Sequence, residues 1–191
     1  MTPDELRQKI STLQNSVVDR MMVMRAANAG VAIIRERTTS GKFLEGSSAG
    51  AEQYSAKPFA RPLGGLTRNT TKALLASGSE IFTSKNKSTW IVVAGGYKRF
   101  RELAGKDSSH VSLTWTGRML RNLGIISADD TGAVISEKDA DMKKLATYHQ
   151  VSGAGKSRRL HKFIGFTADE QVRLKKLVGE EVMKKIKAMI G

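Results

Sequence analysis

The sequence predicts an α+β protein with a long N-terminal helix, a small and mostly antiparallel sheet, an amphipathic C-terminal helix and an extended polar arm. Three observations support this fold class. Apolar residues recur every three or four positions near both ends of the chain, which is the helical period. A buried-strand run and a hairpin signal lie between these two stretches. A segment rich in Gly, Ser and Thr separates the first helical stretch from the strands.

The N-terminal helix is predicted over residues 3–36. Thr2-Pro3-Asp4-Glu5 is a capping box with proline at the first helical position, and it marks the start. A helix of this length extends about 50 Å, farther than a small domain is wide, so we expect other subunits to cover part of its apolar face. The apolar stripe consists of Leu6, Ile10, Leu13, Val17, Met21, Met24, Ala27, Val31 and Ile34. The interface candidates within it are Leu13, Val17, Met21 and Met24.

Residues 38–89 form a polar stretch with few aliphatic side chains, interrupted by Gly and Pro. This composition is not expected to build a core of its own, and an irregular loop of this length is uncommon inside a compact domain. Two alternatives stay open for it: a disordered insertion, or an arm that becomes ordered against neighbouring subunits. A short helix over 70–76 is compatible with both.

Residues 90–191 are predicted to form the α+β core, with the helix over 1–37 and the arm over 38–89 completing one domain overall. Trp90-Ile91-Val92-Val93 has the character of a buried strand, and a short basic helix is expected over 97–103. Further helices are predicted over 117–123 and 137–149. Between them, apolar runs at 125–127 and 133–135 flank Asp129-Asp130-Thr131-Gly132, which is a hairpin signal.

The C-terminal helix is predicted to begin at a second capping box, Thr167-Ala168-Asp169-Glu170. Apolar residues at helical spacing follow it from Val172 to Ile190, and five lysines lie on the other side of the predicted helix. A loop rich in glycine and lysine, over 151–159, precedes this final helix.

Composition narrows the classes of function. The chain has 191 residues, a net charge of +14 and no cysteine, which excludes disulfides and thiolate metal sites and suits a protein made in a reducing cytoplasm. No apolar run approaches roughly 18 residues, the length needed to cross a bilayer, and the polar N-terminus is unlike a secretory signal. The charge favours polyanions or acidic protein surfaces, which leaves a nucleic-acid binder, a peripheral membrane protein or an assembly subunit.

No motif points to catalysis, a cofactor, a metal or a small-molecule substrate. Gly153-Ala154-Gly155-Lys156-Ser157 is similar to a phosphate-binding loop, but Gln150 stands where the full pattern needs its first glycine. The histidines at 110, 149 and 161 lack metal-ligand spacing, and His149 is expected to be structural. Nothing combines a nucleophile, a base and an anion-binding site, so we expect no enzyme.

Basic clusters supply two sets of candidate binding residues. The segment over 158–166, which we call the return segment, leads into the final helix. It places charge beside aromatic residues, a combination that is typical of interface anchors. The interface candidates there are Arg158, Arg159, Lys162, Phe163 and Phe166. The nucleic-acid candidates are Lys98, Arg99, Arg101 and Lys156, but the aromatic residues are too widely spread in the sequence to indicate a platform for single strands.

Three patches in the second half resemble the tailed-phage virion morphogenesis, or tail completion, family. The patch over 111–123 contains Thr116-Gly117-Arg118-Met119-Leu120, which looks like the Thr-Gly-Arg-(Leu/Met)-Leu segment of that family. Leu145-Ala146-Thr147-Tyr148-His149-Gln150, followed by Gly153, is similar to its Tyr-Ala-x-x-His-Gln-x-Gly segment. Residues 158–170 resemble its Arg-x-Phe-Leu-Gly-Leu-Ser-x-x-Asp segment, although the family's preceding proline is absent.

The resemblance implies a structural virion protein of the phage neck, a head–tail connector that acts as a tail completion or tail terminator subunit. Such a subunit would form a homo-oligomeric ring of roughly six or twelve copies, bind portal or adaptor and tail proteins, and surround the DNA that passes through the channel. The alternative is a basic DNA- or RNA-binding accessory protein, whose affinity would fall steeply with salt. A membrane-surface role rests only on the basic C-terminal helix.

Overall fold

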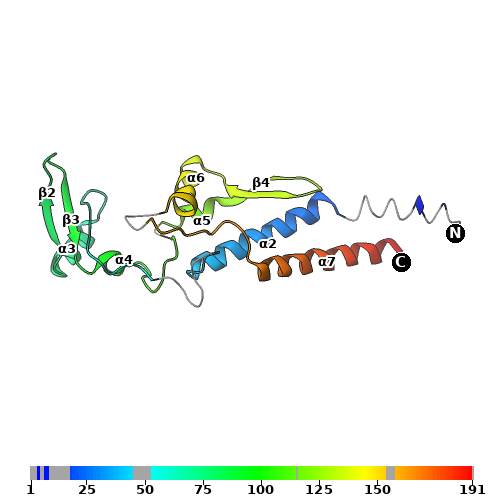
Figure 1. Cartoon of the computed structure of the whole chain (residues 1–191), viewed down its shortest axis with the longest axis horizontal. Helices are drawn as coiled ribbons and strands as arrows, with labels where there is room; N and C mark the ends of the chain where they lie inside the picture. The colour runs from blue at the N-terminus through cyan, green and yellow to red at the C-terminus, as the bar shows by residue number, and fades with distance from the viewer. Residues whose placement is uncertain are drawn as a thin grey trace. The chain divides into compact units, whose positions relative to one another are not determined.

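The computed structural model describes residues 4, 7–8, 18–44, 53–114, 116–153 and 158–190. The chain forms two compact units (Figure 1). The terminal unit contains residues 1–39, 43–48 and 116–191, and the central unit contains residues 40–42 and 49–115. Helices and small antiparallel sheets together confirm the predicted α+β class. The two units are described separately below because each has its own core.

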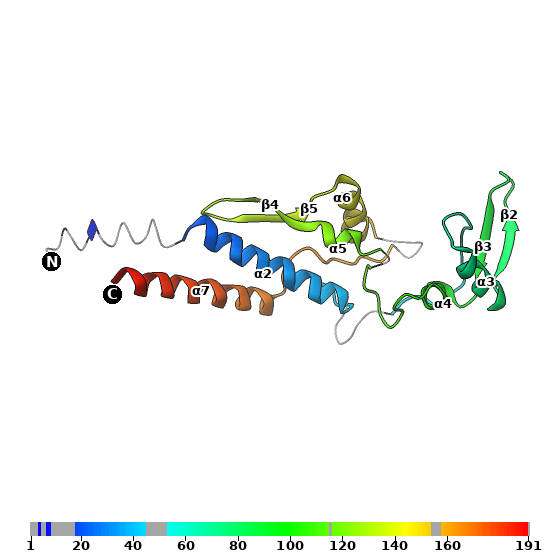
Figure 2. The same ribbon diagram turned by 180° about the vertical axis from the view of Figure 1, so that it is seen from behind.

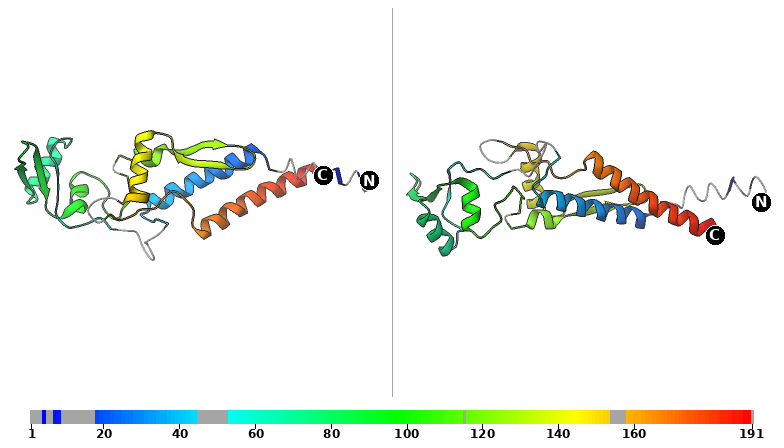
Figure 3. Two further views of the ribbon diagram at one scale, coloured as in Figure 1. Left: turned by 45° about the horizontal axis from the view of Figure 1, so that its top comes forward. Right: turned by 90° about the horizontal axis from the view of Figure 1, so that it is seen from below.

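The terminal unit is built in three layers around helix α2 (Arg20–Thr39). The hairpin of β4 (Leu123–Ala128) and β5 (Ala133–Glu137) packs on one side of α2, and helix α7 (Ala168–Ile190) packs on the other (Figures 1 and 2). The left view of Figure 3 shows the same order of hairpin, α2 and α7. The apolar core residues of α2 are Met22, Ala27, Val31, Ile33 and Ile34.

A close approach in this core requires glycine at position 30. A Cβ atom on Gly30 would lie 2.8 Å from Cζ of Phe166 and 3.3 Å from Cδ1 of Ile135. The helix therefore accepts an aromatic ring from the segment before α7 and an aliphatic side chain from β5 at the same point. Glycine costs helical stability, and here the cost is offset by packing that a larger residue would block.

The start of α2 corrects the prediction of one uninterrupted helix over 3–36. Val18 and Asp19 are not helical, and α2 begins at Arg20. Asp19 explains the start: its Oδ1 accepts from the Met22 amide at 2.8 Å, while its Oδ2 accepts from Lys185 Nζ at 2.8 Å. Of the interface candidates on this helix, Met21 is 65% exposed and Met24 is half-buried. Leu13, Val17 and the capping box at Thr2 and Glu5 lie outside the described residues.

The predicted hairpin and the second capping box are confirmed. Asp129 Oδ1 accepts from the amides of Thr131 and Gly132 at 2.8 and 2.9 Å, which closes the turn between β4 and β5. The helix expected over 137–149 differs from the observed one. Glu137 belongs to β5, and α6 (Ala140–Thr147) begins after Asp139, whose side chain accepts from two amides of the first turn. The predicted helix over 117–123 is present as α5 (Arg118–Asn122).

The central unit contains a three-stranded antiparallel sheet in the order β1-β3-β2. Its strands are β1 (Phe59–Pro62), β2 (Glu80–Thr83) and β3 (Thr89–Val93), and its helices are α3 (Arg68–Ala76) and α4 (Gly96–Leu103). The predicted strand over 90–93 and the predicted basic helix over 97–103 are therefore both present. Leu74, Ile91, Val93 and Phe100 form the core of the unit and are at most 1% exposed.

The polar stretch over 38–89 differs from the arm that the sequence predicted. Two edge strands and helix α3 lie within it, and α3 contributes the fully buried Leu74 to a core. The few apolar residues of this stretch suffice because they join Ile91, Val93 and Phe100 from outside it. Composition alone could not reveal this sharing, since the stretch has too few aliphatic residues to form a core by itself.

One further result concerns membranes. Within the part of the chain that the structure describes, no helix is both long enough and apolar enough to cross a bilayer.

The core of the central unit gives a direct test of this fold. Leu74→Ala is expected to lower the free energy of unfolding by about 2–5 kcal/mol, because it leaves a cavity at a fully buried position. Leu75→Ala is the matched control, since the neighbouring leucine is 43% exposed. Its effect should stay within about 0.5 kcal/mol. Urea denaturation followed by circular dichroism measures both, and equal effects would contradict the assigned core.

Candidate assembly interface

Four exposed apolar side chains in the terminal unit define a surface that we call the apolar ledge: Leu145, Tyr148, Val151 and Leu160, which are 40%, 61%, 73% and 38% exposed. Leu145 lies on α6, and Tyr148 and Val151 lie on the single π-helical turn η1 (Tyr148–Ser152) that continues it. Exposed apolar side chains scattered singly are normal, but a group on adjoining segments marks an interaction site.

Two backbone contacts hold the segments of the ledge together. The His161 amide donates to the carbonyl oxygen of His149 at 2.7 Å. Gly153 ends η1 with a φ of +76°, and a Cβ atom there would lie 2.0 Å from the carbonyl oxygen of Arg158. Only glycine permits this approach. The backbone of Arg158 therefore lies beside the end of η1, and the side chains of Arg158 and Arg159 are exposed.

A layer of aromatic rings lies beneath the ledge. The ring centroids of His149 and His161 are 5.7 Å apart, and those of His161 and Phe43 are 4.9 Å apart, both in edge-to-face geometry. Gln150 Oε1 accepts from the Ile164 amide at 2.9 Å and ties η1 to the return segment. Phe163 is fully buried. These contacts give the exposed residues a fixed base.

Arg37, at the end of α2, also holds the return segment in place. Its guanidinium forms an ion pair with Glu170 and donates to the carbonyl oxygens of Phe163 and Gly165, the latter at 3.2 Å. The Glu170 carboxylate also accepts from the Thr167 amide at 2.8 Å, within the capping box that begins α7. Arg37 is 8% exposed, so this ion pair is shielded from water. We call this set of contacts the Arg37 clamp.

Burial strongly displaces the pKa values of His149 and Glu137 in the terminal unit. Burial, with a smaller contribution from neighbouring His161, lowers the pKa of His149 to about 4, so this ring is neutral at physiological pH. Burial raises the pKa of Glu137 to about 7, although Arg35 opposes the effect. Neither carboxylate oxygen of Glu137 has a hydrogen-bond partner among the described residues. Arg35 instead donates to the carbonyl oxygens of Leu120 and Leu123.

The predicted interface residues separate into exposed and supporting groups. Arg158 and Arg159 are exposed, as the hypothesis requires. Phe163 is not available to a partner, because it is 0% exposed within the chain. Phe166 is half-buried against Gly30 and Lys162 is half-buried. Of the two expected aromatic anchors, Phe163 is therefore a core residue and Phe166 is partly covered, and the more exposed apolar side chains are those of the ledge.

Sequence reasoning missed the ledge because its members occupy ordinary positions in a helical pattern. Tyr148 and Val151 belong to a continuous helix-like run, and the shift to a π-helical turn changes which side chains face solvent. The one available signal was glycine at 153, which marks the end of that turn.

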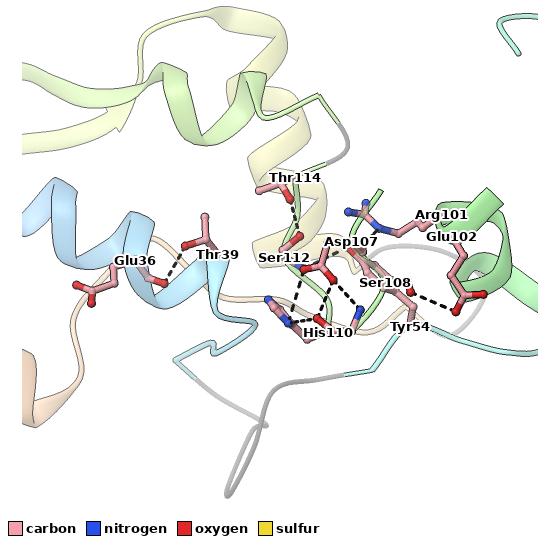
Figure 4. Close-up of polar contacts among 11 residues, drawn as sticks. Glu36, Thr39, Tyr54, Arg101, Glu102, Asp107, Ser108, His110, Ser112 and Thr114 are labelled. Atoms are coloured by element: carbon pink, nitrogen blue, oxygen red, sulfur yellow. Dashed lines mark hydrogen bonds and ion pairs between the residues drawn. The ribbon is translucent and has the colours of Figure 1, made fainter. Parts of the chain in front are cut away.

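The three predicted nucleic-acid residues that the structure describes differ in exposure and in partners. Arg99 pairs with Glu102 at 3.0 Å. Arg101 is 2% exposed, donates from Nε to the carbonyl oxygen of Asp107 at 2.6 Å and lies over the ring of Tyr54 (Figure 4). Burial gives Arg101 a structural role, and Tyr54 in turn accepts from the Ser112 amide (Figure 4). Lys98 is half-buried, and Lys156 lies outside the described residues.

The terminal unit also has an apolar groove of about 230 Å³ between α2, β5 and α7. Its lining includes Val18, Met22, Ala133, Phe166 and Val178. Within the described residues, no group of three or more His, Asp or Glu side chains is placed to hold a metal ion.

Comparison with known proteins adds no assignment: no protein-family model matches the chain, and no match is found among curated proteins or solved structures. The function has to be inferred from the residues themselves.

The Arg37 clamp generates a stability prediction. Arg37→Ala leaves the Glu170 carboxylate and two carbonyl oxygens without their buried donor, and it should cost about 3–5 kcal/mol of unfolding free energy. Arg25→Ala is the control, because the Arg25–Glu181 pair at 3.0 Å is largely exposed and should contribute at most about 1 kcal/mol. Thermal and urea unfolding measure both variants. Similar losses in the two would show that the clamp is not a buried anchor.

His149 generates a prediction about pH. Its folded pKa of about 4 lies below the unfolded value near 6.5, so the unfolded chain binds the proton more readily between these values. Stability is therefore lost as pH falls from about 6.5 toward 4, by at most about 3 kcal/mol from this residue. His149→Phe keeps a ring but cannot titrate, and its stability should fall less than that of the wild type over the same window. Equal pH dependence in urea titrations would refute the assignment.

Proposed function

We propose that this chain is a structural subunit of the neck of a tailed bacteriophage, which joins portal or adaptor proteins to tail proteins as one member of a ring. The observation that carries the proposal is the apolar ledge flanked by Arg158 and Arg159 on a rigid base. Tyr and Arg are enriched at protein interfaces, and a pre-ordered base lowers the entropy cost of docking. A surface of this kind fits a partner that presents an apolar pocket with an acidic rim.

The three sequence patches that resemble tail completion proteins support the proposal by where they lie. The Thr-Gly-Arg patch continues into α5, which packs on α6. The second patch forms the end of α6 and η1, and the third forms the return segment and the start of α7. The hydrogen bonds from His161 to His149 and from Ile164 to Gln150 join the second patch to the third. Residues that are separate in the sequence thus build one surface.

A ring follows from repeated use of two different surfaces on each subunit. The ledge of one copy would contact another face of its neighbour, and such head-to-tail contacts close into a ring when the rotation between copies allows it. Met21 and the apolar groove beside α2 and α7 offer a second face in the same unit. We propose roughly six or twelve copies, located in the virion between head and tail. The net charge of +14 would favour acidic partners and the DNA in the channel.

The test is a charge reversal at the ledge. Arg158→Glu with Arg159→Glu should leave the far-ultraviolet circular dichroism spectrum unchanged but reduce binding to portal-bearing heads of the same phage by roughly tenfold or more. Binding is measured by co-sedimentation at moderate salt with nuclease present, and the mass of the complex gives the copy number. Arg68→Glu with Lys72→Glu is the control, since it makes the same charge change at exposed positions of α3.

Two outcomes would contradict different parts of the proposal. If the wild-type chain does not bind heads or other neck proteins, the proposed function is wrong. If the chain binds and the double variant binds equally well, the function stands and the ledge is not the contact surface. A loss of binding in the control variant would show that total charge, and not the ledge, drives the association.

A further inference from the structure

One face of the three-stranded sheet in the central unit is not covered by the helices. Side chains alternate between the two faces along each strand. On β3, Ile91 and Val93 are 0% exposed and pack with Leu74 of α3 and Phe100 of α4. Trp90 and Val92 point to the opposite face and are only half-buried, although β3 is the central strand. We call this opposite side the open face.

The open face has an aromatic centre and one carboxylate at its edge, Glu80 of β2, which lies across from Val92. Phe82 on β2 lies directly across from Trp90 on β3, and Pro62 on β1 lies across from Trp90 on its other side. Residues opposite one another in an antiparallel pair point to the same face. Phe82 is 41% exposed. An exposed phenyl ring and a tryptophan on neighbouring strands thus share one solvent-facing surface.

A rigid basic turn borders this face. The Ser84 amide donates to the Ser88 carbonyl oxygen at 2.8 Å, and the Lys87 amide donates to the Ser84 carbonyl oxygen at 2.9 Å. Lys87 adopts a left-handed φ of 58°, as expected for a three-residue hairpin loop. The exposed Lys85 and Lys87 therefore lie at a defined hairpin tip, three and five residues after Phe82 in the sequence.

The charge of the central unit indicates the kind of partner. Residues 53–114 contain ten Lys and Arg and three Asp and Glu, a net charge of 10 − 3 = +7. Of the three carboxylates, Glu102 is paired with Arg99 and Asp107 accepts from Ser109, while the exposed Glu80 lies across from Val92 on the open face. A second copy of so basic a unit would be repelled, whereas a polyanion would be attracted. The exposed ring of Phe82 and the half-buried ring of Trp90 offer flat surfaces for stacking. A nucleic acid can supply bases that stack on them, whereas a simple acidic peptide cannot.

We propose that the open face binds single-stranded nucleic acid, with bases stacked on Trp90 and Phe82 and phosphates contacted by Lys85 and Lys87. Aromatic rings accept any base whose flat face is exposed, and duplexes hide those faces inside the stack. The site is therefore independent of sequence and selective for single strands over duplexes. It uses none of the four residues that the sequence indicated for nucleic acid, and it is separate from the apolar ledge of the terminal unit.

The test uses the full chain and a fluorescently labelled 20-nucleotide oligo(dT) in an anisotropy titration. Trp90→Ala and Phe82→Ala are each expected to weaken binding by roughly tenfold, while Trp90→Phe recovers most of the affinity because it keeps a ring. Ile81→Ala is the matched control: Ile81 lies next to Phe82 and is 42% exposed, but it points to the other face of the sheet, so its affinity should stay within about twofold. Lys85→Glu with Lys87→Glu should weaken binding and reduce its dependence on salt.

Several results would overturn the inference. Unchanged affinity in Trp90→Ala and Phe82→Ala would mean that the oligonucleotide responds only to the overall positive charge. A 20-base-pair duplex that binds as tightly as the single strand would exclude base stacking. If analytical ultracentrifugation shows a dimer that Phe82→Ala dissociates, and oligonucleotide affinity does not change, the open face is a contact between copies. Arg158→Glu with Arg159→Glu should retain affinity for oligo(dT) within about threefold, so failure here is distinguishable from failure of the neck assignment.

Discussion

The buried contacts of Arg37 are the constraint on which the terminal unit depends. This one side chain joins the end of α2 to the return segment through Phe163 and Gly165, and to the start of α7 through Glu170. A guanidinium that is removed from water has to recover its lost hydration through several partners. The carbonyl groups and the carboxylate supply them, and all three lie within the segment 163–170. Any movement of α7 or of the return segment would therefore expose the Arg37 guanidinium to water or leave it buried without its hydrogen-bond partners.

This constraint explains why the apolar ledge can stay exposed without losing its position. Tyr148 and Val151 contribute little to the core, so their placement depends on the layer beneath them. His149, His161 and Phe43 form that layer, and Gln150 connects it to the segment that Arg37 holds. The exposed side chains are thus positioned by packed residues at which substitution is poorly tolerated. Exposed apolar side chains on a fixed base are suited to docking a protein partner.

Burial of Glu137 and burial of His149 change the stability of the terminal unit in opposite directions as pH changes. The raised pKa of Glu137 means that the folded chain retains this proton more readily than the unfolded chain, so its contribution to stability is lost as pH rises from about 4.5 through 7. The lowered pKa of His149 has the opposite sign, and its contribution is lost as pH falls from about 6.5 toward 4. The two effects oppose one another over the same range. In Glu137 the cause is burial of the carboxylate, and the guanidinium of Arg35, which opposes the rise in pKa, donates to backbone carbonyl groups.

The sequence by itself determined the elements whose signals are local. The capping box at Thr167 and Glu170, the turn at Asp129 and the strand over 90–93 depend on residues within a few positions of one another, and each was predicted. Local periodicity could also mislead: the helical spacing continues from Val17 to Met21, yet α2 begins only after Asp19, whose carboxylate accepts from the Met22 amide and from distant Lys185.

Only the tertiary structure decided which residues are available to a partner. Phe163 has the composition of an interface anchor and is buried, whereas Leu74 lies in a polar stretch and completes the core of the central unit. Arg101 belongs to a basic cluster but is shielded by contacts with Tyr54 and Asp107. Trp90 and Phe82 are eight positions apart in the sequence, and the strand register makes them neighbours. The reason is physical: burial and neighbourhood are set by contacts between distant segments, and the residue types alone do not encode which of those contacts form.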